Sequence, residues 1–164
     1  MKTYQEFMQE SSLSRIKSKS DKSGIATLSA DRGDKSRKEN QARSQQLQKD
    51  IRGKFGRGPT KVKGSYLEKD EKTGKETKVK EKSYVIDRGK MSRKKFKKKV
   101  KELGKKYKQD SVLTQTKKTA TLHATRKGGL GPKTKGINVG RFRPQVKNPE
   151  GQSQIKGKTF SYGD

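Results

Sequence analysis

Apolar residues recur at helical spacing in a first segment of the chain. An amphipathic helix is predicted over residues 36–54 by the stripe of Ala42, Leu47, Ile51 and Phe55. Ser36 and Glu39 match a capping box, in which each side chain accepts a hydrogen bond from the other residue's backbone N–H. Glycines and a proline follow the stripe and are expected to end the helix.

A second helix is predicted over residues 92–108. Its apolar stripe consists of Phe96, Val100, Leu103 and Tyr107, spaced four, three and four residues apart. The other positions of this segment are polar, and most of them are Lys. The helix is therefore expected to bury one narrow face and to expose a basic one.

Several other segments have the composition or the alternation of β-strands. They cover residues 24–30, 60–68, 77–87, 110–116 and 119–125. The first six elements run strand, helix, strand, strand, helix, strand, and one more strand follows. This order predicts an α+β fold, a small split βαβ (ferredoxin-like) domain over 24–126 with two helices on one face of an antiparallel sheet.

The flanking segments are too polar to build a core. Residues 11–23 are predicted to be a flexible Ser- and Lys-rich linker. Residues 127–164 are predicted to be a basic Gly- and Pro-rich tail in extended conformation, with one short strand at 158–162. Residues 1–10 are a separate unit.

Composition narrows the function further. Only 24% of the residues are hydrophobic and the net charge is +28, so an anionic partner is expected. No apolar run is long enough to span a membrane, and no membrane partner is predicted. The chain has no Cys, which excludes disulfides and thiolate chemistry, and it has a single His. No metal and no cofactor are predicted.

The densest charge lies between Arg88 and Lys108, which contain 12 basic residues and only one acid, Glu102. A solvated surface normally mixes charges of both signs, so this run favours binding of phosphates. Lys predominates over Arg and few aromatic residues are free to stack on bases, so the binding is expected to be independent of sequence. The predicted partner is double-stranded DNA, contacted by Arg88, Lys90, Arg93, Lys94, Lys95, Lys97, Lys98, Lys99, Lys101, Lys105, Lys106, Lys108, Arg141 and Arg143.

The first ten residues, MKTYQEFMQE, have a net charge of −1 at the head of this basic chain. Tyr4, Phe7 and Met8 would share one face of a short helix, which fits either a docking peptide or a frayed terminal helix. The peptide closely resembles the capsid-targeting sequence of internal head proteins of T-even-type bacteriophages. The resemblance implies that Tyr4, Phe7 and Met8 dock on the prohead scaffold. It also implies cleavage by the prohead protease between Glu10 and Ser11, where Met8 stands in place of the usual Leu or Ile.

Residues 24–113 resemble a second family of small bacterial and phage proteins that contain a domain of unknown function. The resembling positions are Ser29, Ala30, Ser36, Glu39, Asn40, Ala42, Arg43, Leu47, Gly64, Glu81, Ser83, Tyr84, Val85, Ile86, Leu103, Gly104 and Gln109–Leu113. This resemblance supports the αβ fold. It implies no reaction and no catalytic residue.

Other candidates for chemistry have simpler explanations. Ser29, Glu39 and Asn40 could line a small polar pocket, although capping already accounts for Glu39. His123 lies opposite the apolar side of its strand and fits an ordinary surface residue. The acids Asp70, Glu71 and Glu76 fit a solvated turn, and the glycine-rich segment 128–133 lacks the ending of a phosphate-binding loop.

These observations favour an internal phage virion protein that is not an enzyme. It is expected to enter the prohead core, to be cleaved after Glu10 and to bind packaged DNA in the virion interior. Ejection with the DNA would then bring it to the host cytoplasm. Two alternatives stay open. One is an ejected effector that inhibits a host nuclease or restriction enzyme, and the other is an enzyme acting on nucleic acid or nucleotides with a site near Ser29, Glu39 and Asn40. A ribosomal or RNA-binding protein would explain the charge but not the first ten residues.

Overall fold

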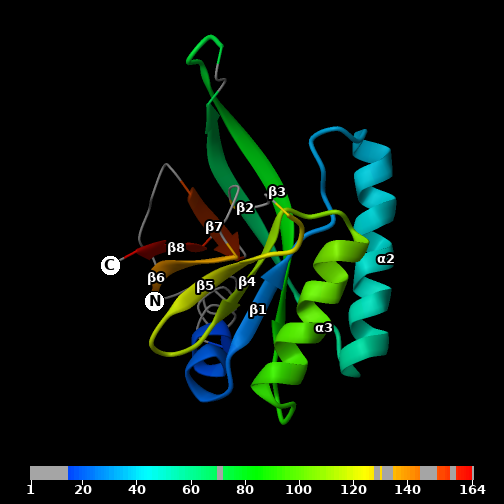
Figure 1. Ribbon diagram of the computed structural model, residues 1–164, viewed down its shortest axis with the longest axis vertical. Helices are drawn as coiled ribbons and strands as arrows, with labels where there is room; N and C mark the ends of the chain where they lie inside the picture. The colour runs from blue at the N-terminus through cyan, green and yellow to red at the C-terminus, as the bar shows by residue number, and fades with distance from the viewer. Residues whose placement is uncertain are drawn as a thin grey trace, which may run out of the picture.

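A computed structural model of the chain describes residues 15–69, 72–127, 130, 135–144, 151–155 and 158–163. Side chains are described over 15–63, 72–77, 81–127, 130 and 135–140. Two helices cover one side of an antiparallel β-structure, and a long hairpin projects beyond them (Figure 1). The protein has an α+β fold, as the sequence predicts.

The predicted split βαβ arrangement is present. Its elements are β1 (Ile25–Leu28), α2 (Arg37–Phe55), β2 (Thr60–Lys69), β3 (Glu76–Asp87), α3 (Arg93–Lys106) and β4 (Ser111–Gln115). Antiparallel pairing of β1 with both β3 and β4, and of β2 with β3, gives the strand order β4-β1-β3-β2. This is the order of a ferredoxin-like sheet.

The sheet continues beyond the predicted domain and closes on itself. The further strands are β5 (Ala120–Ala124), β6 (Gly136–Pro144), β7 (Gly151–Ile155) and β8 (Lys158–Gly163). Strand β5 pairs with β4, and the order β5-β6-β8-β7 then leads to β2, which gives a closed barrel. The sequence predicted extended coil with one strand at 158–162 for this region. The structure has β6 and β7 there as well, because backbone pairing with the edges of β5 and β2 forms strands that have little apolar alternation of their own.

Both helices begin and pack as their sequences indicate. Ser36 caps α2 and completes the capping box with Glu39, with N···O distances of 3.1 and 3.2 Å. Leu47, Ile51 and Phe55 are buried, but the fourth buried position is Ser44, whereas Ala42 is exposed and the prediction for it was wrong. The α3 stripe of Phe96, Val100, Leu103 and Tyr107 is buried throughout, as predicted.

The core lies between the helices and strands β1, β3 and β4. Its members from the strands are Ala26, Leu28, Tyr84, Ile86 and Val112. Between the helices, the Phe55 and Phe96 rings meet edge to face at 5.7 Å between centroids. No helix within the described part of the chain is long and apolar enough to cross a membrane.

The predicted linker over 11–23 differs from the structure where it is described. Residues 15–22 are helical, and Ile16 and Ser20 are buried. Gln115 Nε2 donates a 2.8 Å hydrogen bond to Ser20 Oγ, and Ser23 Oγ donates one of 2.6 Å to Asp87. These contacts attach the segment to β3 and β4 through Ile16, Ser20 and Ser23, while its charged residues stay exposed to solvent.

The two helices contain glycines whose substitution should have opposite effects. A Cβ at Gly104 in α3 would lie 2.7 Å from methyl groups of Val112 and Thr125, both of which are buried, whereas a Cβ at Gly53 in α2 would meet nothing within 4 Å. We expect Gly104→Ala to lower the free energy of unfolding by about 1–3 kcal/mol through overpacking. The matched control Gly53→Ala should raise it by about 0.5–1 kcal/mol, because Ala is the better helix former. Urea denaturation of both variants checks this, and equal effects would contradict the close approach of α3 to β4.

Candidate functional site

A cleft of about 630 Å³ opens on the side of the strands that faces away from the helices. On β1, Ala26 belongs to the helix-side core, whereas Thr27 lines the cleft. The same alternation places Tyr84 in the core and Ser83 at the cleft. Successive residues of a strand point to opposite faces, so the cleft lies on the inner face of the barrel.

Loop residues after β1 and α3 complete the cleft. Its lining consists of Thr27, Leu28, Ser29, Asp31, Arg32, Gly33, Asp34, Glu81, Ser83, Lys108, Gln109, Asp110, Ser111, Leu113, Leu122 and Arg126. Four of these sixteen residues are acidic, although the whole chain has only 17 acids among 164 residues. Three lining residues, Arg32, Lys108 and Arg126, are basic, so the lining has a formal charge of −1 in a protein whose net charge is +28.

Glu81 is the acid that the barrel holds most closely. It is half-buried on β3, directly opposite Gly64 of β2 in the strand register. Burial raises the pKa of the Glu81 carboxyl, and the nearby Asp31 carboxylate raises it further, while the Ser29 hydroxyl acts in the opposite direction. Perturbed carboxyls of this kind are typical of functional sites.

Asp31 is fixed by elements on both sides of the sheet. Its carboxylate accepts hydrogen bonds from Lys82 N at 3.0 Å and from Ser44 Oγ of α2 at 3.2 Å. Its backbone N–H donates to Ser29 Oγ at 3.1 Å, and Gln109 Nε2 donates to its carbonyl at 3.1 Å. The loop that carries Asp31 into the cleft is thus positioned by β3, by α2 and by the segment after α3.

The other two acids are paired at the rim. Arg32 binds Asp34 at 2.9 Å, and Arg126 binds Asp110 at 2.6 Å. The Asp34 and Asp110 side chains are 60% and 59% exposed, so solvent weakens both pairs. Within the described residues, Asp31 and Glu81 form no ion pair. The uncompensated negative charge therefore lies inside the cleft.

The structure separates Ser29, Glu39 and Asn40, which were predicted to line one small polar pocket. Ser29 lines the cleft and donates to the Lys82 carbonyl at 2.7 Å. Glu39 is exposed, belongs to the α2 cap and lies outside the cleft. Asn40 forms two 3.0 Å hydrogen bonds with the backbone of Arg32, so it supports the loop. The prediction of a pocket at all three is corrected to Ser29 alone, because Glu39 and Asn40 are engaged in local backbone contacts.

His123 is half-buried on β5 and is not among the cleft residues. Its Nε2 lies 2.7 Å from Thr114 Oγ1. Burial lowers the pKa of His123, and the positive charges of Lys97 and Lys101 lower it further. Among the described residues no group of acids and His could hold a metal ion.

The predicted DNA-binding residues fall into several groups. The Arg88 guanidinium donates to the carbonyls of Ser23 and Met91, Lys106 pairs with Asp50 at 2.7 Å, and Lys99 donates to the Lys54 carbonyl at 3.2 Å. Lys101 is half-buried. Exposed cations that form no ion pair within the described residues are Lys90, Arg93, Lys94, Lys95, Lys97, Lys98, Lys105 and Lys108, here called the α3 basic surface.

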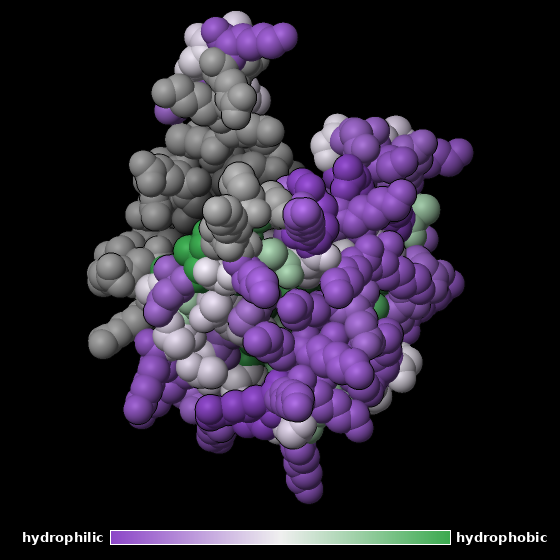
Figure 2. All heavy atoms as spheres, in the orientation of Figure 1, coloured by the Kyte–Doolittle hydropathy of each residue, from purple (hydrophilic) through white to green (hydrophobic). Residues whose placement is uncertain are grey.

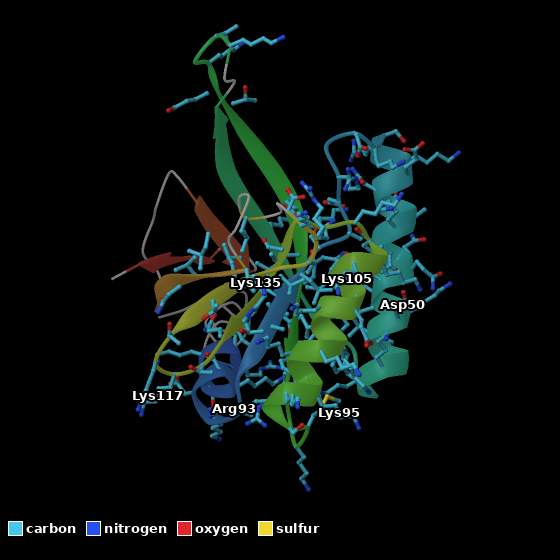
Figure 3. The ribbon with its side chains drawn as sticks, viewed as in Figure 1. Asp50, Arg93, Lys95, Lys105, Lys117 and Lys135 are labelled. Atoms are coloured by element: carbon cyan, nitrogen blue, oxygen red, sulfur yellow. The ribbon has the colours of Figure 1, made fainter. Side chains whose placement is uncertain are left out.

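Hydrophilic residues cover this face over α2 and α3 (Figure 2), and Arg93, Lys95 and Lys105 lie along α3 (Figure 3). Arg141 and Arg143 are in β6, but their side chains lie outside the described ones. The predicted docking and cleavage residues Tyr4, Phe7, Met8, Glu10 and Ser11 also lie outside the described residues, as do Asp70 and Glu71 and most of segment 128–133. Glu76 is exposed at the start of β3.

The burial of the Glu81 carboxyl lowers the stability of the fold by an amount that depends on pH. Because its pKa is raised in the folded protein, the folded state binds more protons than the unfolded state above the ordinary pKa of Glu, about 4.3, and stability falls as the pH rises through the raised value. We expect the stability gained by Glu81→Gln, relative to the wild type, to grow between about pH 4 and pH 7. Urea denaturation at both pH values checks this, with Glu76→Gln on the same strand as the control for loss of one charge. A difference that shrinks with rising pH would contradict the burial of this carboxyl.

Comparison with known proteins gives the chain a family. No curated protein sequence matches it. The model of the S-Adenosylmethionine lyase family matches residues 26–163, a range that includes every residue lining the cleft and nearly all of the segment that resembles a domain of unknown function. This match spans most of the 164 residues, so the chain belongs to the S-adenosylmethionine lyase family.

Proposed function

We propose that this protein binds S-adenosylmethionine in the barrel cleft and cleaves it. The observation that carries the proposal is the concentration of acids in the cleft of a protein with a net charge of +28. S-adenosylmethionine is a sulfonium cation, and nearby negative charge offsets the cost of burying a cation. The volume of about 630 Å³ falls in the range of ordinary small-molecule sites. Membership of the S-adenosylmethionine lyase family supports this choice of substrate and reaction class.

Glu81 and Asp31 are the residues we assign to the cation. Both lie inside the cleft, whereas Asp34 and Asp110 are neutralised by arginines at its rim. Fixed hydrogen bonds orient Asp31, and burial strengthens any interaction of Glu81 with a positive charge. We therefore place the sulfonium near Glu81, where a charge in a low-dielectric site acts most strongly.

A lyase breaks a carbon–sulfur bond of this substrate without adding water. The bonding electron pair passes to sulfur, which becomes a neutral thioether. The carbon that loses sulfur is then satisfied within the same molecule, either by loss of a proton from the neighbouring carbon or by attack of the substrate's own carboxylate. In the first case Glu81, a stronger base than a surface carboxylate, accepts the proton. In the second case Glu81 holds the sulfonium cation in place while the substrate's own carboxylate attacks.

Purified protein is expected to convert S-adenosylmethionine to a thioether without consuming water. We expect Glu81→Gln to lower kcat/KM by about tenfold to hundredfold, because the charge next to the reacting group is lost. Glu76→Gln, an exposed change on the same strand, is the matched control and should keep wild-type kinetics. Chromatography with mass detection follows both products, and their masses decide between the two fates of the carbon fragment. Full activity of Glu81→Gln would overturn the assignment of this residue.

A second role is favoured by a different observation, the one-signed α3 basic surface together with the targeting-like peptide at residues 1–10. We propose that the protein is an internal head protein of a phage, cleaved after Glu10 and packaged with DNA that it binds without sequence preference. Exposed Lys side chains suit this role, because each is a mobile point charge for phosphate. The inhibition of a host nuclease or restriction enzyme stays a prediction.

The packaging role predicts the state of the N-terminus in the particle. Removal of residues 1–10 should leave Ser11 as the first residue of the protein in purified virions. Mass spectrometry of virion proteins measures this directly, and precursor proheads provide the uncleaved reference. Met1 on every copy in mature virions would contradict the processing step.

A further inference from the structure

The α3 basic surface runs to the mouth of the cleft. Lys108 follows the end of α3 and lines the cleft, and its carbonyl accepts a hydrogen bond from Arg32, another lining residue. Lys105, one helical turn earlier, lies near the end of α3 that leads to the cleft (Figure 3). The same end of the helix therefore carries part of a polyanion surface and part of the rim of the site.

The charges at the mouth and inside the cleft have opposite signs. Arg32 and Arg126 are each offset by a rim carboxylate, whereas Lys108 forms no ion pair within the described residues. Inside, Asp31 and Glu81 are uncompensated by cations. A cationic substrate is attracted by the interior but must approach through the field of a protein with a net charge of +28.

We propose that duplex DNA bound on the α3 basic surface raises the affinity of the cleft for its cationic substrate. DNA neutralises the lysines that repel the substrate, and its own cation atmosphere concentrates positive ligands close to the rim. The protein would thus be a lyase whose affinity for its substrate depends on a bound polyanion. This inference rests on the proposed function, since it needs a cationic ligand in the cleft.

The arrangement of layers lets both ligands bind together. Helix α3 lies on the outer side of the strands (Figure 1). Its buried stripe belongs to the core shared with β1, β3 and β4, and the residues of the α3 basic surface are exposed to solvent. The cleft lies on the inner side of the same strands. DNA on the outer face therefore leaves the inner face open while it changes the potential at the shared rim.

The experiment compares two ligands of different charge with and without a short DNA duplex. S-adenosylmethionine is the cationic probe, and S-adenosylhomocysteine, which has a thioether in place of the sulfonium, is the neutral one. At low ionic strength we expect the duplex to lower the Kd of S-adenosylmethionine about threefold and to leave that of S-adenosylhomocysteine unchanged. The effect should vanish at about 0.5 M salt, where charges beyond a few ångströms are screened. Rapid ultrafiltration of the full chain in the cold, completed before the substrate is cleaved and with mass detection to verify that it is intact, measures each Kd, and a duplex-only control corrects for ligand bound by the DNA.

Two pairs of substitutions distinguish the effect of cations at the mouth of the cleft from the effect of cations elsewhere on the protein. Lys105→Gln with Lys108→Gln removes two cations at the mouth, and we expect about twofold tighter binding of S-adenosylmethionine without DNA and a smaller effect of DNA. The matched control is Lys117→Gln with Lys118→Gln in the turn between β4 and β5. That turn follows Gln115, the end of β4 opposite to the cleft residue Ser111, and Lys117 lies well apart from Lys105 (Figure 3). The control pair should behave as the wild type.

The outcomes are distinguishable. No binding of S-adenosylmethionine under any condition would overturn the proposed function and this inference with it. Binding that the duplex leaves unchanged or weakens would overturn the coupling alone. A duplex that does not bind would overturn both the coupling and the proposed binding of DNA. A shift that is equal for both ligands would also overturn it, because the mechanism acts on the charge of the ligand.

Discussion

Strands β1, β3 and β4 each present apolar side chains to α2 and α3, and the alternate side chains, most of them polar, to the cleft. The period of two along a strand makes these two sets inseparable. A slip of one residue would turn Glu81 and Ser83 toward the helices and bring Tyr84 into the cleft. The packing that stabilises the domain therefore also fixes which side chains form its site.

Charge is the second constraint on this protein. With 45 basic and 17 acidic residues, each carboxylate has many possible partners, and its position is informative. Asp50 joins the helices by accepting hydrogen bonds from Lys106 and Tyr107. Burial alone would raise the pKa of Asp50, but these hydrogen bonds and that from Gln46 outweigh it, so the pKa is lowered. Asp31 and Glu81 differ because no cation of the described residues accompanies them, which suits a ligand that brings its own positive charge.

The fold was largely predictable where apolar periodicity is strong. The stripes of α2 and α3, the capping box at Ser36 and the order of the first six elements all follow from it. After Lys127, the predicted strand at 158–162 is confirmed as β8. Strands β6 and β7 were not predictable in this way, because they are formed by pairing with existing edges, which leaves little trace in the local sequence.

The cleft was predicted only through Ser29. A usable signal was present in the alternation of β3, where Tyr84 and Ile86 mark one face and Glu81 and Ser83 the other. A carboxylate and a hydroxyl on the inner face of a predicted strand indicate a polar interior. What the sequence could not show is that this face is enclosed, since the enclosing strands were not recognised.

The closing contact of the barrel joins β2 to β7, strands separated by most of the second half of the chain. Contacts of such long sequence separation form late and slow the folding of a chain. During synthesis, α2, α3 and strands β1 to β5 emerge before β7 does, so a nascent chain can bury its helices while the ring is still open. Until β7 reaches β2, the polar inner face is solvated and the edge of β2 is free to pair. The order of synthesis therefore leaves the edge of β2 open to pairing with another chain for longer than it leaves the helix-side core unburied.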